Sequence, residues 1–247
     1  AMRLLDSKHP NYHADIQKHL ALDPERKIRN AIQIKLLQKD KRPKVLAIGH
    51  GLGGGVVKHI HELGGGLENQ CIQLFLKPVD DLWLELSCNQ KGFDIVLYFE
   101  RSDYSDLVKL ITSVPVSRLH WHHTMGYRFT EIENLMQLNI PMWATIHDYY
   151  WIGGNPTLTD VTGIFAADLV NRDEECTRSY PLPFEATLIE WREFYARFLM
   201  RCDKCIAPSA IAAEQMFTYY PSIHIDIVQH LDWEINAPYR SPFVPKL

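Results

Sequence analysis

The sequence predicts an α/β protein with a doubly wound, mostly parallel sheet. Short apolar runs alternate with amphipathic helical patterns along most of the 247 residues. The first run leads through a glycine-rich turn straight into a helical pattern, in the stretch KVLAIGHGLGGGVVKHIHEL at 44–63. Histidine-rich and polar stretches follow several of the runs. Alternating strands and helices favour parallel pairing, and ligands of such sheets bind beyond the carboxyl ends of the strands.

The expected strands are short apolar runs bounded by turn residues. They cover residues 45–48, 71–76, 94–99, 118–122, 141–146, 204–207 and 223–228. Helical spacing between the runs predicts helices that follow the first turn, Ser105, Thr130, Phe184 and Ser209. Serine side chains accept hydrogen bonds from the first turn of a helix, so Ser105 and Ser209 are predicted N-caps. The glycines at 64–66 are expected to end the first of these helices.

The chain divides into three parts. Residues 1–43 are polar, with apolar residues at helical spacing on either side of 23–24, and predict an N-terminal arm of two helices. Residues 44–235 carry all of the expected strands. Within them, 149–183 are irregular and predict a long functional loop or insertion. Residues 236–247 contain three prolines and no periodicity, which indicates a linker.

Composition excludes several classes of protein. Hydrophobic residues make up 46% and charged residues 23% of the chain, which is ordinary for a globular protein. The net charge of −4 gives no basic field for nucleic acid. No apolar run reaches the length of a membrane span, and the N-terminus has no signal-peptide pattern. The five cysteines form no even framework. We therefore expect a cytoplasmic protein with reduced thiols.

The glycine cluster after the first strand has two interpretations. Glycines can let the turn pack tightly on the helix. Alternatively, Gly53, Gly54 and Gly55 can form a backbone wall for a phosphate-bearing or sugar ligand, because a helix N-terminus attracts anions. The cluster lacks the full dinucleotide fingerprint and the lysine of a P-loop.

His120, His122 and His123 form the densest group of imidazoles in the sequence. Alternation along a strand would place His120 and His122 on one face. Because histidine titrates near neutrality, a hydrogen-bonding or acid/base role is one interpretation and a structural role the other. No further ligands at metal-binding spacing accompany the group, so no metal is expected.

His147 and Asp148 follow the strand at 141–146 and precede three aromatic residues at 149–151. Polar groups beside aromatic rings suit a carbohydrate, whose apolar faces stack and whose hydroxyls need hydrogen bonds. A structural corner is the alternative. Cys202 and Cys205 have CxxC spacing without a second pair, so zinc or redox chemistry is not favoured. No GxSxG elbow is present for a serine nucleophile.

Several of these segments together resemble the N-terminal half of a retaining glycosyltransferase of family 4, which has the GT-B fold. The segments are HGLGGGVVKHIHEL at 50–63, HWHHTMG at 120–126, PMWATIHDYYWI at 141–152, CIAPSAIAAEQM at 205–216 and IVQHLDWE at 227–234. The chain departs from the family at Ile152–Pro156, where many relatives have Cys-Pro-Arg. A second departure is Gln229-His230-Leu231, where Pro-His-Gly is usual.

This resemblance implies two Rossmann-like domains with the active site between them. Residues 44–235 would be the acceptor-binding domain, and 236–247 would lead to a C-terminal donor domain that is missing from this chain. The implied reaction moves a sugar from a nucleotide-sugar to a glycan or lipid-linked acceptor with retention. A non-catalytic glycan- or nucleotide-binding module of a larger protein is the alternative. A dehydrogenase is disfavoured because no acidic residue ends the strand at 71–76.

The resemblance also implies roles for the candidate residues. His122 would contact the transferred sugar at the reacting centre, and Gly53, Gly54 and Gly55 would face the donor diphosphate. The acceptor side would be lined by His120, His123, His147, Asp148 and Tyr149. Neither a cofactor nor a metal is expected. Basic residues of the N-terminal arm, such as Lys27 and Lys35, suggest peripheral association with the inner face of a membrane.

Overall fold

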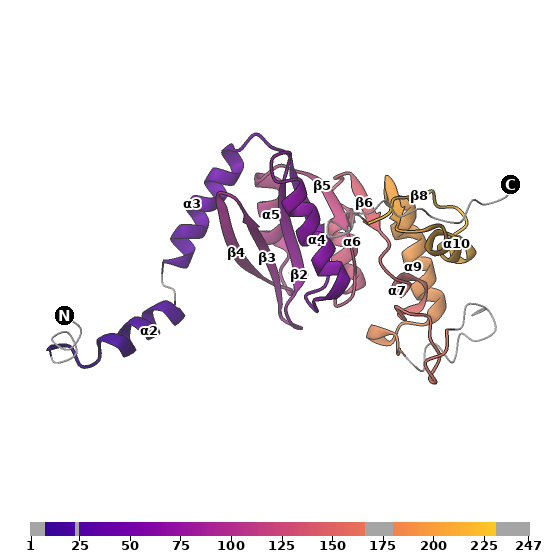
Figure 1. Cartoon of the computed structure of the whole chain (residues 1–247), viewed down its shortest axis with the longest axis horizontal. Helices are drawn as coiled ribbons and strands as arrows, with labels where there is room; N and C mark the ends of the chain where they lie inside the picture. Colours follow the sequence, from indigo (N-terminus) through magenta and orange to yellow (C-terminus); the bar gives the residue numbers. More distant parts are fainter. Residues whose placement is uncertain (1–7, 23–24, 166–179, 231–247) are drawn as a thin grey trace, which may run out of the picture.

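The chain forms one α/β sheet of eight strands in the computed structural model, which describes residues 8–22, 25–165 and 180–230. The strand order is β4-β3-β2-β1-β5-β6-β7-β8 (Figure 1). The strands are β1 Lys44–Ile48, β2 Ile72–Pro78, β3 Trp83–Gln90, β4 Phe93–Glu100, β5 Val116–Trp121, β6 Met142–Thr145, β7 Lys204–Ala207 and β8 Ile225–Ile227. Neighbouring strands are parallel except that β3 runs antiparallel to β2 and β4. The predicted mostly parallel α/β sheet is confirmed.

Eight α-helices and one 3-10 helix, η2, lie in the described ranges. They are α2 Tyr12–Leu22, α3 Arg26–Lys39, α4 Gly54–Gly66, α5 Ser105–Ser113, α6 Phe129–Met136, α7 Tyr150–Gly153, η2 Pro183–Glu185, α9 Leu188–Arg201 and α10 Ala210–Tyr219. None of these helices has the length and apolar character needed to cross a membrane.

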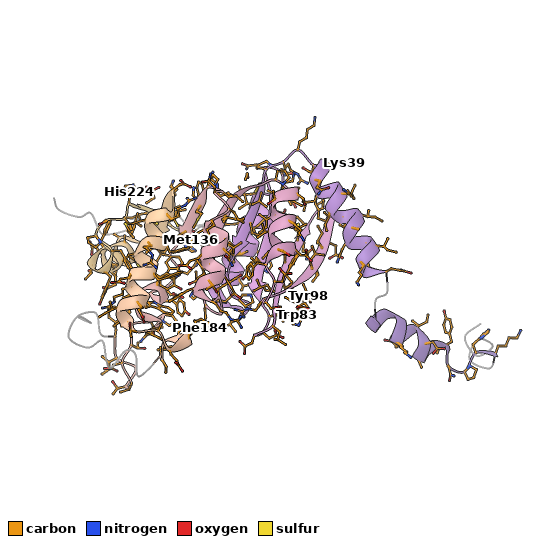
Figure 2. All side chains as sticks on the ribbon, turned by 180° about the vertical axis from the view of Figure 1, so that it is seen from behind. Lys39, Trp83, Tyr98, Met136, Phe184 and His224 are labelled. Carbon is orange, nitrogen blue, oxygen red and sulfur yellow. The ribbon has the colours of Figure 1, made fainter. Side chains whose placement is uncertain are left out.

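The sheet separates two apolar clusters because successive strand residues point to opposite faces. On one face, Ala47 and Phe75 pack against Val56 and Ile60 of α4. On the other, the alternate strand residues join buried residues of α5, α6, α9 and α10 in the main core. Figure 1 shows α4 in front of the strands, whereas the view from behind shows the helix that carries Met136 in front (Figure 2).

The hairpin of β3 and β4 was not anticipated as such, because β3 was missed. Its buried residues, Leu84, Leu86 and Cys88, alternate with Glu85 and polar residues that face outward. A strand with one solvated face has this alternation instead of a continuous apolar run. The sequence interpretation relied on continuous runs and therefore overlooked β3. The chain therefore passes from β2 to β4 through an antiparallel strand.

The predicted helix ends are partly confirmed. Helix α4 ends within the predicted glycines, at Gly66, and its C-cap is Leu67. A Cβ at Gly64 would lie 2.8 Å from Nε2 of Gln73, so close packing against β2 explains this glycine. Ser105 gives α5 no side-chain cap; its backbone N–H donates to Asp103. The cap at Ser209 is confirmed, since its side chain accepts from the backbone N–H of Ala212.

The N-terminal arm contains the two predicted helices. Leu37 of α3 is buried in the main core, and Asn30 Nδ2 donates to the backbone oxygen of Val96 on β4. These contacts attach α3 to the β4 edge. Helix α2 projects away from the sheet in both views (Figures 1 and 2). The predicted linker at 236–247 lies outside the described residues.

Candidate functional site

The candidate site lies at the point where the strand order reverses. Strand β1 pairs with β2 on one side and with β5 on the other, so the connections that follow β1 and β5 diverge there. The backbone N–H of His122 donates to the oxygen of Ile48 over 2.7 Å, and that of His123 donates to the same oxygen over 3.3 Å. These bonds hold the loop that begins at His122 beside the glycine turn that follows Ile48. Ligands of open α/β sheets bind at such a crevice.

The glycines of the turn divide into two kinds. A Cβ at Gly49 would lie 3.0 Å from the end of the Ile60 side chain, so a larger residue there would displace Ile60. In contrast, a Cβ at Gly53, Gly54 or Gly55 would meet no atom within 4 Å. Gly53 and Gly54 have φ values of 80° and 72°, which other residues rarely adopt. The backbone of residues 53–55 is therefore exposed for an external group.

Among the described residues, no side chain neutralises the partial positive charge at the N-terminus of α4. Gly53 is its N-cap and provides no side chain to accept a hydrogen bond from the helix, and the first turn has no acidic residue. The first N–H groups of a helix lack intrahelical partners and attract negative charge. This end of α4 therefore suits an anion such as a phosphate.

His122 lies at the centre of the site. Its side chain is buried, and its Nδ1 is 3.1 Å from Nε2 of His147, which follows β6. Its Nε2 is also buried and has no hydrogen-bond partner among the described residues. An unsatisfied buried polar atom costs about 1–3 kcal/mol, so proteins retain one mainly where it has a task.

Four other imidazoles surround His122. Together the five residues form what we call the histidine cluster: His59, His120, His122, His147 and His230. The ring centroid of His59, on α4, is 5.4 Å from that of His122 and 5.0 Å from that of His147. His120 lies 4.0 Å from His122 and hydrogen-bonds Thr145 over 2.8 Å. Nδ1 of His230 meets Nδ1 of His59. The cluster joins α4, β5, the end of β6 and the segment after β8.

Burial keeps the cluster neutral. It lowers the pKa of His59 to about 4, that of His120 to about 3 and that of His147 to about 2. It lowers the pKa of His122 well below its ordinary value, and the neighbouring imidazoles add to the effect. Neutral imidazoles each offer one donor and one acceptor. The cluster can therefore hydrogen-bond hydroxyl groups without carrying charge at neutral pH.

A pH dependence of stability follows from this neutrality. The folded-state pKa of His122 lies below the unfolded value of about 6.5, so stability is complete above pH 6.5 and falls as the pH drops. We therefore expect the free energy of unfolding to decrease between pH 6.5 and pH 5, with His122 contributing to the loss. Urea unfolding at both pH values should show a smaller loss for His122→Asn than for wild type.

His224 provides the control for this measurement, because its side chain is 90% exposed. His224→Asn removes only an exposed contact to Asp226 and should leave the unfolding free energy at each pH close to that of wild type. The same loss of stability in wild type and His122→Asn would contradict a neutral, buried His122.

His123 and Asp148 form a separate pair, in which both ring nitrogens and both carboxylate oxygens have hydrogen-bond partners. Nε2 of His123 is 3.1 Å from Oδ2 of Asp148, and Nδ1 accepts the backbone N–H of Met125. Because Nδ1 accepts, Nε2 carries the proton and donates to the carboxylate. Oδ1 of Asp148 accepts the backbone N–H of Tyr150. The pair ties the loop after β5 to the start of α7, and His50 packs edge-on against the His123 ring.

Tyr149 contacts residues of the predicted insertion. Its backbone N–H donates to Pro156, and its ring centroid is 6.5 Å from that of Phe165. The ring therefore faces the predicted insertion, of which residues 166–179 lie outside the described ranges. Of the candidate residues, His120, His122 and His147 lie together in the cluster; His123 and Asp148 are adjacent to it. Gly53–Gly55 border the same crevice.

Sequence reasoning missed His59, His50 and His230. His59 is three residues after Val56 and four before Leu63, so helical spacing already placed it on the face of α4 that packs on the sheet. His50 lies in the glycine turn itself. His230 carried no comparable signal, because its place depends on how the segment after β8 returns to α4.

No set of three His, Cys, Asp or Glu side chains in the described ranges is arranged to hold a metal ion. Cys202 and Cys205 are free thiols at the junction of α9 and β7. Comparison with known proteins gives no match to a family model and none to a curated protein.

Proposed function

We propose that this chain is the acceptor-side domain of a retaining glycosyltransferase, which transfers a sugar from a nucleotide-sugar to a glycan or lipid-linked acceptor. One observation carries the proposal: the open glycine turn and the buried His122–His147 pair meet where the strand order reverses. This juxtaposition combines an anion-binding backbone with neutral donors and acceptors for hydroxyl groups. A nucleotide-sugar presents both chemistries within a few ångströms.

The glycine turn would bind the diphosphate of the donor. Backbone N–H groups at the start of α4 would stabilise the negative charge that develops on the leaving group. Residues 53–55 suit this role because they leave the backbone open and bring no acidic side chain. A side chain at these positions would cover the N–H groups.

The transferred sugar would lie against His122, whose Nε2 has no described partner. A sugar hydroxyl that bonded this nitrogen would satisfy it, and the bond would be strong because the surroundings exclude water. His120, His147 and Tyr149 would border the acceptor, while the His123–Asp148 pair would hold the loop that presents them. The donor domain, in this proposal, is attached beyond the linker at 236–247.

The test of the proposal is nucleotide release by the chain joined to that donor domain. The protein would be incubated with a panel of nucleotide-sugars, with and without glycan and lipid-linked acceptors, and nucleoside diphosphate would be measured. Release from one donor, increased by an acceptor, is the expected result. No release from any donor would reject the transferase.

A non-catalytic glycan- or nucleotide-binding module is the second candidate. It is favoured by one feature of the histidine cluster: none of its five rings is hydrogen-bonded to a carboxylate within the described residues. Without such a partner a neutral imidazole is a weak base. Tight binding of a nucleotide-sugar without release of nucleotide would support this module.

We also propose that α3 mediates peripheral association with an anionic membrane. Ile28, Ile32 and Leu36 recur at every fourth residue and are exposed by 63%, 55% and 48%. The helix contains five basic residues and no acidic residue. Apolar residues flanked by lysines are typical of helices that lie in a membrane interface.

Sedimentation with liposomes tests this association. The protein should sediment with anionic vesicles and remain in the supernatant with zwitterionic ones. Ile32→Ser should weaken binding to anionic vesicles by several-fold, because it removes buried apolar area. Val161→Ser is the matched control, since Val161 is also exposed but lies far from α3 in the chain. Equal sedimentation of wild type and Ile32→Ser would exclude α3 as the contact.

A further inference from the structure

A groove of about 630 Å³ lies on the face of the sheet that carries α4. One wall is formed by Leu63 and Leu67 at the end of α4. Arg118 of β5, Trp143 of β6 and Ile206 of β7 form the floor, because these strand residues point to the same face. The volume falls within the range of small-molecule sites, about 300–1,000 Å³. His59 and His120 of the histidine cluster close one end.

Arg118 is a cation without an anionic partner among the described residues. Its guanidinium carbon lies 3.9 Å from the centroid of the Trp143 ring. It forms no hydrogen bond or ion pair with any residue that the structure describes. Its side chain is half-buried, so its N–H groups can be reached from the groove. Stacking on an aromatic ring fixes the plane of a guanidinium while its N–H groups stay available.

The other charged groups near the groove are already neutralised. Lys204 pairs with Asp226 over 2.8 Å, and Glu62 on the α4 wall lies 3.6 Å from Lys58. Arg118 therefore determines the charge that a bound molecule would meet. The remaining lining combines aliphatic and aromatic side chains with four uncharged polar ones, Gln70, Gln73, Thr145 and Gln229. A guanidinium that is oriented by stacking, at the floor of an apolar groove, recognises a negatively charged group joined to an apolar body.

We infer that this groove binds a small amphiphilic anion, with its carboxylate or phosphate on Arg118 and its apolar body along Leu63, Leu67 and Trp143. The groove adjoins His120, which the proposed function places on the acceptor side, but Arg118, Leu63, Leu67 and Trp143 have no role in the proposed sugar transfer. A charge-assisted hydrogen bond contributes more than a neutral one, so loss of the guanidinium should weaken binding by about tenfold or more.

The experiment is a fluorescence titration with two probes of similar shape. Anilinonaphthalene sulfonate carries a negative charge, and N-phenyl-1-naphthylamine does not. Arg118→Gln should raise the Kd of the anionic probe by about tenfold or more and leave the Kd of the neutral probe unchanged. Circular dichroism of the variant would show that the fold is retained. Equal affinity of wild type and Arg118→Gln for the anionic probe would overturn the inference.

Arg197→Gln is the matched control. Arg197 also approaches an aromatic ring, that of Phe194, but it lies on α9, which packs on the opposite face of the sheet. This variant should bind both probes like wild type; a loss equal to that of Arg118→Gln would show that the probe binds elsewhere. Displacement of the probe by decanoate or decyl phosphate, but not by decanol, is expected. The competitor that displaces the probe at the lower concentration identifies carboxylate or phosphate as the preferred anion. Equal displacement by decanol would contradict recognition of the anion.

Discussion

Replacement of His122 by alanine is expected to reduce nucleotide release by about 10²–10³-fold in the proposed transferase. The physical reason is the loss of a preorganised hydrogen-bonding group in a buried site, which typically has an effect of this size on the reaction. The hydrogen bond to His147 and the backbone bond to Ile48 fix the position of His122. A water molecule that filled the space left by alanine would not be held in the same orientation. Steady-state release from the preferred donor is the measurement.

Two further variants make this result interpretable. His122→Asn retains a polar group at the position and should recover part of the activity if hydrogen bonding is the role of His122. His224→Ala, at an exposed position, should retain wild-type release. If His122→Ala is folded and as active as wild type, His122 is not in the reacting centre, whatever the protein transfers.

Replacement of Arg101 by methionine is expected to lower the free energy of unfolding by about 3–5 kcal/mol. Arg101 and Glu131 form a buried bidentate pair, with both N···O distances at 2.7 Å. The substitution leaves the Glu131 carboxylate buried without its counter-charge. Arg101 also donates to the backbone oxygens of Asp80 and Gly126, so its loss frees the loop that follows β5. Urea unfolding at neutral pH measures the change.

The double variant Arg101→Met, Glu131→Leu separates the charge from the packing. Replacing a buried ion pair by apolar residues removes the penalty of an unpaired charge, so the double variant should be more stable than Arg101→Met. The exposed pair of Lys109 and Asp106 provides the control, and Lys109→Met should leave stability unchanged within error. A double variant less stable than Arg101→Met would show that Glu131 is stabilised by its other contacts.

Local patterns were sufficient to predict most of the sheet. The run that became β1 is apolar because it is buried on both faces, and continuous runs of this kind are visible without tertiary information. Helix α4 was found from its glycine turn and its period of 3.6 residues. The alternating pattern of β3 was weaker, since its outward face carries polar side chains, and that strand was missed.

The sequence by itself determined the fold class, the two N-terminal helices, and the fact that the glycine turn and the two histidine segments follow strand ends. Tertiary structure decided which side chains meet. His122 bonds His147 because β5 and β6 are neighbours, and His59 joins them because α4 crosses the same face of the sheet. Arg118 stacks on Trp143 of the neighbouring strand, and no described residue neutralises its charge in the groove. These contacts depend on strand order and register. Both are set by interactions between residues that are distant in sequence, and those interactions form only when the chain folds.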